Sequence, residues 1–146
     1  MGGFVGVRYC EQSRPRDSER PRSMRKKDRN VRVLIVEDEV LLAMHIEDLV
    51  REMGFEVVGP VGRTDEAIDL IKSDDISVAL LDVRLRQSET VYPAADLLRI
   101  KGIPFILTTA YGSESIDPRY AEDPVVKKPF TLRELESKLR TVLKQH

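Results

Sequence analysis

The sequence predicts an α/β fold in which a parallel sheet carries helices on both faces. Short apolar runs rich in β-branched residues alternate with helical segments along the chain. The run at residues 78–81 is apolar without a break, as in strands buried on both faces, and it ends on Asp82. Functional sites in such sheets form at the carboxyl ends of the strands. The 146 residues suit one domain of this kind.

Strand and helix patterns follow one another from residue 31 to the end of the chain. Each predicted helix places apolar residues three or four positions apart on one face. The predicted strands are residues 31–36, 55–61, 76–81, 103–108 and 125–127, and the predicted helices are residues 40–53, a segment between Thr64 and Asp74, residues 92–101, and a segment after Thr131.

Local signals define the ends of these helices. Gly54 is expected to cap the carboxyl end of the first helix, and Thr64 is expected to be the N-cap of the second. Pro93 suits the first turn of the third helix. Thr131 and Glu134 have the spacing of a capping box, which predicts the start of the last helix.

Two stretches carry turn residues instead of a periodic pattern. Residues 110–124 contain Gly112, Pro118 and Pro124 with few apolar residues, and the pattern is compatible with one short helix or none. Residues 59–62 contain two glycines and a proline, and we expect a turn there rather than a glycine-rich phosphate loop.

Residues 1–30 differ from the rest of the chain in charge. They hold nine basic and four acidic residues, whereas residues 31–146 hold 15 basic and 21 acidic residues. We expect a disordered basic tail followed by one folded domain over residues 31–146. Contact of the tail with nucleic acid or an anionic membrane is one interpretation. The other interpretations are that the tail is simply solvated, or that the true first residue is Met24.

The sequence predicts a cytoplasmic protein. Its single cysteine, Cys10, cannot form an intramolecular disulfide, which suits a reducing compartment. No apolar run approaches the roughly 20 residues that span a bilayer, and the chain does not start with a signal-peptide pattern.

Charged and hydroxyl side chains gather at the predicted strand ends. Glu37 and Asp38 follow the first strand, Asp82 the third, Thr109 the fourth and Lys128 the fifth. Three carboxylates brought together repel one another unless a cation neutralises them, and an all-oxygen ligand set with open positions favours Mg²⁺. A hydroxyl and an ammonium would then face phosphate oxygens. The set therefore suits transfer of a phosphoryl group onto Asp82.

Four short motifs resemble the receiver domain of two-component response regulators, and the resemblance covers roughly residues 31–144. A further stretch partly matches the Phe-Ala-Thr-Gly-Tyr-Gly signature of a stand-alone receiver subgroup. The four motifs are Ile35-Val36-Glu37-Asp38-Glu39, Leu80-Leu81-Asp82-Val83-Arg84-Leu85, Thr109-Ala110 and Lys128-Pro129-Phe130, and the further stretch is Leu107-Thr108-Thr109-Ala110-Tyr111-Gly112.

The resemblance implies a flavodoxin-like (βα)5 sandwich with a parallel five-stranded sheet of order 2-1-3-4-5. It implies that a histidine kinase or phosphotransfer protein phosphorylates Asp82. Glu37, Asp38, Asp82 and the backbone carbonyl of Arg84 would hold Mg²⁺, with Glu37 acting directly or through water. The Arg84 side chain would either shield the acyl phosphate from water, pair with a phosphate oxygen, or remain a solvated loop arginine.

The resemblance also implies how the site would switch. Thr109 would contact the phosphoryl oxygens and move inward, Lys128 would pair with them, and the peptide bond between Lys128 and Pro129 would be cis. Receivers commonly carry an aromatic switch residue in the fifth strand, where this chain has Val125, and Tyr111 is expected to take part of that role. The switch would then be a rearrangement of residues 110–124.

We therefore expect a single-domain response regulator that is not an enzyme and that signals to an unknown protein target by protein–protein interaction. One alternative is a receiver-like interaction module that is not phosphorylated. A second is a Mg²⁺-dependent aspartyl phosphohydrolase. Such enzymes usually carry an acid two residues after the nucleophile, where this chain has Arg84.

Overall fold

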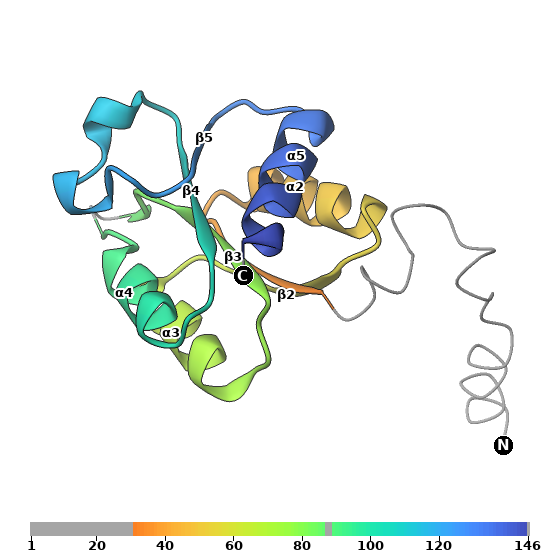
Figure 1. The fold of residues 1–146 in the computed structure, drawn as a ribbon, viewed down its shortest axis with the longest axis horizontal. Coiled ribbons are helices and arrows are strands. Elements are labelled where there is room, and N and C mark those ends of the chain that lie inside the picture. Colours follow the sequence, from red (N-terminus) through yellow and green to blue (C-terminus); the bar gives the residue numbers. More distant parts are fainter. Residues whose placement is uncertain (1–30, 87–88, 146) are drawn as a thin grey trace, which may run out of the picture.

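The computed structural model describes residues 31–86 and 89–145, so the predicted tail of residues 1–30 lies outside the described residues. Five parallel strands form one sheet of order β2-β1-β3-β4-β5, as predicted (Figure 1). The elements are β1 (Arg32–Val36), α2 (Val40–Glu52), β2 (Glu56–Val61), α3 (Thr64–Ser73), β3 (Val78–Asp82), α4 (Tyr92–Ile100), β4 (Phe105–Thr109), the 3-10 helices η5 (Ser113–Ser115) and η6 (Pro118–Tyr120), β5 (Val125–Lys127) and α5 (Leu132–Lys144).

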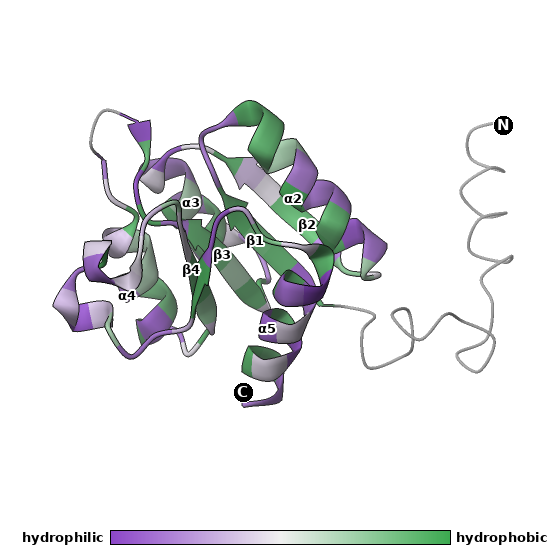
Figure 2. Cartoon of the chain, turned by 90° about the horizontal axis from the view of Figure 1, so that it is seen from above, coloured by the Kyte–Doolittle hydropathy of each residue, from purple (hydrophilic) through white to green (hydrophobic). Residues whose placement is uncertain are grey.

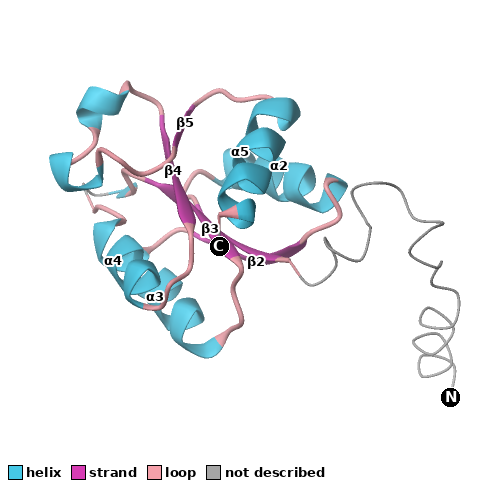
Figure 3. Ribbon diagram, viewed as in Figure 1, coloured by secondary structure: helices cyan, strands magenta, loops and turns pink. Residues whose placement is uncertain are grey.

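Two helices cover each face of the sheet. Helices α2 and α5 lie on one face, and α3 and α4 lie on the other (Figure 3). Side chains alternate along a strand, so each strand supplies both cores. In β3, Val78 and Leu80 pack under α2 and α5, whereas Ala79 and Leu81 pack under α3 and α4. The central strands β1 and β3 are mostly hydrophobic, whereas the helices combine hydrophobic and hydrophilic residues (Figure 2). No helix among the described residues is long and apolar enough to cross a membrane.

Most of the predicted helix ends are confirmed. Gly54 follows α2 with a φ of +88°, a value that glycine adopts without strain. Pro93 lies in the first turn of α4. At the start of α5, the Thr131 side chain accepts from the Glu134 amide and the Glu134 side chain accepts from the Thr131 amide.

The prediction that Thr64 is an N-cap is wrong. Thr64 is already the first residue of α3, and Arg63 before it has no capping side chain. The Thr64 amide instead donates to Glu89 Oε1 at 2.8 Å, and its hydroxyl donates to the Thr90 carbonyl at 2.8 Å. The cap therefore comes from a carboxylate 25 residues away in the β3–α4 loop, which no local pattern reveals.

The predicted turn at residues 59–62 is also wrong. Strand β2 continues to Val61 through a cis Gly59–Pro60 bond, with a φ of +89° at Gly59. The register between β1 and β2 shifts at this point, between Leu34 and Val36. The glycine and proline thus form an irregularity inside an edge strand, a place where both residues are tolerated.

The segment at residues 110–124 contains η5 and η6 and no α-helix. It is held on the α4 side of the sheet. The rings of Tyr92 and Tyr120 stack with centroids 4.3 Å apart, and the Asp117 amide donates to the Tyr92 hydroxyl at 2.8 Å. Tyr120 also donates to an Asp96 carboxylate oxygen. Aromatic packing and side-chain hydrogen bonds thus fix the second half of this segment without helical periodicity.

Candidate functional site

The acidic residues predicted from the strand ends converge at the carboxyl edge of the sheet. Strands β3 and β4 each begin two residues later and end one residue later than predicted, so Asp82 and Thr109 are last residues of strands. Carboxylate oxygens of Glu37, Asp38 and Asp82 all lie within 4.8 Å of one another. We call these three residues the acid cluster.

A single ammonium group bridges two members of the acid cluster. Lys128 Nζ lies 2.7 Å from Glu37 Oε1 and 3.2 Å from Asp82 Oδ2. Glu37 and Asp82 are both buried, and the Lys128 side chain is only 14% exposed. The second Glu37 oxygen accepts from the Glu39 amide at 3.1 Å, which fixes the carboxylate at the start of α2.

The bridge leaves the acid cluster short of positive charge. Burial, followed by the charge of Glu37, raises the pKa of Asp82 to about 7, although Lys128 acts against this shift. Burial acts to lower the pKa of Lys128, but its hydrogen bond to Glu37 and the charge of Asp82 outweigh burial and raise it. One buried ammonium and the exposed Arg86 guanidinium therefore stand against three carboxylates, and a bound divalent cation would relieve the repulsion between them.

The acid cluster fits a hard divalent metal ion, because every ligand atom it offers is a carboxylate oxygen. The Asp38 side chain is 15% exposed, and its Oδ2 lies 3.6 Å from Nε of the exposed Arg86. The Arg84 amide donates to Asp82 Oδ1 at 3.3 Å, so the Arg84 backbone lies beside the Asp82 carboxylate. The ligand role of the Arg84 carbonyl stays a prediction.

Gly62 is a site residue that sequence reasoning missed. A Cβ placed on it would lie 3.1 Å from Cα of Asp38 and 3.3 Å from Cβ of Asp38. The absence of a side chain at Gly62 therefore lets the β2–α3 loop pack against the backbone that carries the acid. The signal in the sequence was a glycine at the end of a strand that neighbours β1.

Thr109 and Tyr111 belong to a separate hydrogen-bonded turn. The Thr109 hydroxyl accepts from the Tyr111 amide at 3.0 Å and lies 3.3 Å from Ser115 Oγ. The Thr109 carbonyl accepts from the Lys128 amide at 2.7 Å. Among the described residues, the side chains of Thr109 and Tyr111 make no hydrogen bond with the acid cluster or with the Lys128 ammonium. The Tyr111 ring is 61% exposed, and the Arg84 guanidinium lies 5.8 Å from its centre. The exposed Arg84 side chain therefore lies against an aromatic ring.

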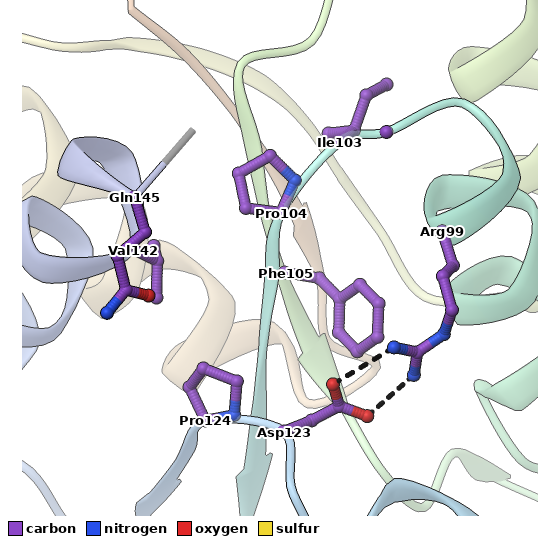
Figure 4. Close-up of a pocket in the computed structure, with 9 residues that line it drawn as sticks. Arg99, Ile103, Pro104, Phe105, Asp123, Pro124, Val142 and Gln145 are labelled. Atoms are coloured by element: carbon purple, nitrogen blue, oxygen red, sulfur yellow. Dashed lines mark hydrogen bonds and ion pairs between the residues drawn. The ribbon is translucent and has the colours of Figure 1, made fainter.

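A hollow at the opposite end of the sheet differs in chemistry (Figure 4). Its volume is about 150 Å³. The Arg99 guanidinium donates to both Asp123 carboxylate oxygens, at 3.3 and 2.7 Å, so the charges in its wall are matched. We therefore place the functional site at the acid cluster. The hollow is lined by Arg99, Gly102, Ile103, Pro104, Phe105, Asp123, Pro124, Val142 and Gln145.

The fold and the acid cluster together define a receiver, and comparison with known proteins agrees. The family model of the response regulator receiver domain matches residues 33–140, and the chain belongs to this family. The solved structure of SdrG from Sphingomonas melonis Fr1 is 36% identical with a TM-score of 0.71, and the match covers 78% of this chain and 97% of that chain. A second SdrG structure, of its BeF3-activated conformation, is 37% identical with a TM-score of 0.68, covering 77% and 95% of the two chains.

Curated relatives are longer than this chain. The transcriptional regulatory protein PdtaR of Mycobacterium tuberculosis is 28% identical over 107 residues, which are 71% of this chain and 52% of PdtaR. The chain spans about half the length of the curated relatives that it matches. The similarity thus covers the receiver domain and not the remainder of those proteins.

Proposed function

We propose that the chain accepts a phosphoryl group on Asp82 from a histidine kinase or phosphotransfer protein and passes the signal on by protein–protein interaction. The observation that carries this proposal is the environment of Asp82. Its carboxylate is buried at the end of the central strand, between two further acids and Lys128. A carboxylate at such a position is a phosphoryl acceptor whose surroundings can bind a cation and the incoming phosphate oxygens.

In the transfer step, an oxygen of the Asp82 carboxylate forms a bond to phosphorus while the bond between phosphorus and the donor's histidine nitrogen breaks. Glu37, Asp38, Asp82 and the Arg84 carbonyl would hold Mg²⁺, which would supply the positive charge that phosphoryl transfer requires. Before the transfer, Lys128 Nζ lies 3.2 Å from Asp82 Oδ2. After the transfer, its ammonium pairs with a phosphoryl oxygen.

The response then passes to the β4–β5 connection. Thr109, at the end of β4, donates its hydroxyl proton to a phosphoryl oxygen. Since the Tyr111 amide is bonded to that hydroxyl, movement of Thr109 displaces Tyr111 and the exposed turn that follows. In this proposal the part of residues 110–124 that lies nearest Thr109 changes shape without a helix shift, because residues 110–124 contain no α-helix.

We further propose that the chain acts in the cytoplasm as a single-domain regulator without an enzymatic activity of its own. The near-complete coverage of the SdrG chain supports a receiver that functions alone. The BeF3-activated structure of SdrG supports a phosphate-responsive switch in a similar chain.

The test is intact-mass analysis after incubation with Mg²⁺ and acetyl phosphate. The wild-type chain should gain one phosphoryl group. Asp82→Asn should gain none, and neither should the wild-type chain in EDTA. Asp69→Asn, which removes an exposed carboxylate from α3, should behave as wild type. A wild-type chain that gains no mass and also leaves its spectra unchanged with beryllofluoride would contradict the proposal.

A further inference from the structure

The proton of the Thr109 hydroxyl can be assigned from the contacts around it. Ser115 Oγ lies 2.7 Å from the Gly112 carbonyl, which can only accept, so Ser115 donates its one proton there. Ser115 Oγ is therefore left as an acceptor toward Thr109, 3.3 Å away. The Tyr111 amide already donates to Thr109. Thr109 thus accepts from Tyr111 and donates to Ser115.

It follows that Ser115 and a phosphoryl group would compete for the same hydroxyl proton of Thr109. Phosphoryl oxygens have no proton to give, so a bond from Thr109 to the phosphoryl group must use the same proton that Ser115 now receives. Thr109 can satisfy one of the two acceptors at a time. The bond to Ser115 and the bond to the phosphoryl group exclude each other.

We propose that Ser115 is a positioning residue that holds the Thr109 hydroxyl in its resting orientation and opposes the phosphorylated conformation. The inference rests on the proposed function of Asp82 and Thr109. Loss of the bond on phosphorylation would release Ser115, the last residue of η5, together with the turn that begins at Tyr111.

The contacts beyond Ser115 limit how far this release extends. The Asp117 amide is bonded to Tyr92, and Tyr120 is stacked on the same ring. Asp123 is held by both guanidinium nitrogens of Arg99. These contacts fix residues 117–123 on α4, so the released part is residues 110–116.

The chain provides a matched control two residues away. Ser113 is the first residue of the same 3-10 helix and is exposed. Within the part of the chain that the structure describes, its hydroxyl makes no hydrogen bond to another side chain or to the backbone. Removing the Ser113 hydroxyl alters the same short helix without touching Thr109.

The experiment is calorimetric titration of the full chain with beryllofluoride in Mg²⁺. Ser115→Ala should bind the analogue roughly 3- to 10-fold more tightly, the range that one hydrogen bond contributes. Ser113→Ala and Ser115→Thr, which keeps a hydroxyl, should bind as wild type. In the resting state, amide exchange across residues 110–116 should rise in Ser115→Ala and remain unchanged across residues 117–123.

A double-mutant cycle separates this role from general loosening of the loop. In a Thr109→Val background there is no proton to compete for, so adding Ser115→Ala should leave the affinity unchanged. Equal affinities of Ser115→Ala and wild type, or tightening that persists in the valine background, would overturn the role of Ser115 and leave the proposed function standing. A wild-type chain that does not respond to beryllofluoride would overturn both.

Discussion

Charged side chains at the two ends of the sheet are paired in different ways. At the carboxyl end, Lys128 is shared between Glu37 and Asp82, and Asp38 lies close to both acids. At the amino end of β4 and β5, Arg99 and Asp123 form a one-to-one pair. Matched charges tie segments together, whereas unmatched buried charges store repulsion that a ligand can relieve. The comparison separates a structural ion pair from a binding site within one small domain.

The strongest test of this contrast removes one carboxylate from each end. Asp38→Ala should weaken Mg²⁺ binding by about 100-fold, or roughly 3 kcal/mol, because one of the three clustered carboxylates is lost. Asp123→Ala should leave the Mg²⁺ affinity unchanged, since that acid lies outside the cluster. Isothermal titration with MgCl2 measures both affinities. Equal weakening by the two variants would show that the acid cluster is not the cation site.

The pH dependence of stability gives the second test. The pKa of Asp82 is raised to about 7 by burial and Glu37, above the value of roughly 3.9 for an unfolded chain. Between these values the folded state holds a proton that the unfolded state has released. This contribution to the free energy of unfolding is therefore present at low pH and is lost as pH rises toward 7.

Asp82→Asn removes this titration. Relative to wild type, the variant should gain roughly 2 kcal/mol of stability between pH 5 and pH 7, and little more above pH 7. Urea unfolding in EDTA at several pH values measures the difference. Asp123→Asn, at the matched end of the sheet, provides the control. A difference between Asp82→Asn and wild type that is constant with pH would contradict the raised pKa.

A third test probes the matched pair directly. Arg99→Ala should lower the free energy of unfolding by about 1 kcal/mol, because it removes a two-pronged ion pair and packing against the rings of Phe105 and Tyr120. Its Mg²⁺ affinity should equal that of wild type. Arg119→Ala should lower the free energy of unfolding by less, because the ion pair of Arg119 with Asp117 is more exposed. Loss of cation binding in Arg99→Ala would mean that the two ends are coupled.

The smallest expected effect concerns Arg86, which competes with a cation for Asp38. Its Nε lies 3.6 Å from Asp38 Oδ2, and its side chain is 74% exposed. An ion pair this exposed is worth well under about 1 kcal/mol, so Arg86→Ala should tighten Mg²⁺ binding by roughly two- to threefold. The gain should disappear in high salt, which screens the competition. Weaker binding in Arg86→Ala would contradict this role.

The sequence pattern was sufficient to predict the parallel sheet and the convergence of the acid cluster, whereas the sheet order followed from the resemblance of four motifs to receiver domains. Apolar runs mark the strands, and parallel strands bring their carboxyl ends to one edge, so Asp82 and Lys128 could be placed together. The cap on Thr64 could not be predicted, because it comes from Glu89 across the fold. Interactions between residues distant in sequence leave no local pattern.

The direction of hydrogen bonds was a second feature that could not be predicted from the sequence. Thr109 and Tyr111 were identified from a motif, but Ser115 carries no signal of its own in the sequence. Its importance depends on where its proton goes, which follows only from the position of the Gly112 carbonyl. The course of residues 110–124 was similarly open, because stacking between Tyr92 and Tyr120 replaces helical periodicity there.

The close approach of Gly62 to Asp38 limits the substitutions that this lineage can accept. No positive φ requires glycine at this position, so the constraint is space alone: an added Cβ would meet the Asp38 backbone at 3.1 Å. Even the smallest side chain would require the Asp38 backbone, which carries a proposed cation ligand, to shift by a few tenths of an ångström. In a mutational library selected for Mg²⁺ binding, Gly62 should therefore accept larger side chains poorly, although it contributes no ligand atom.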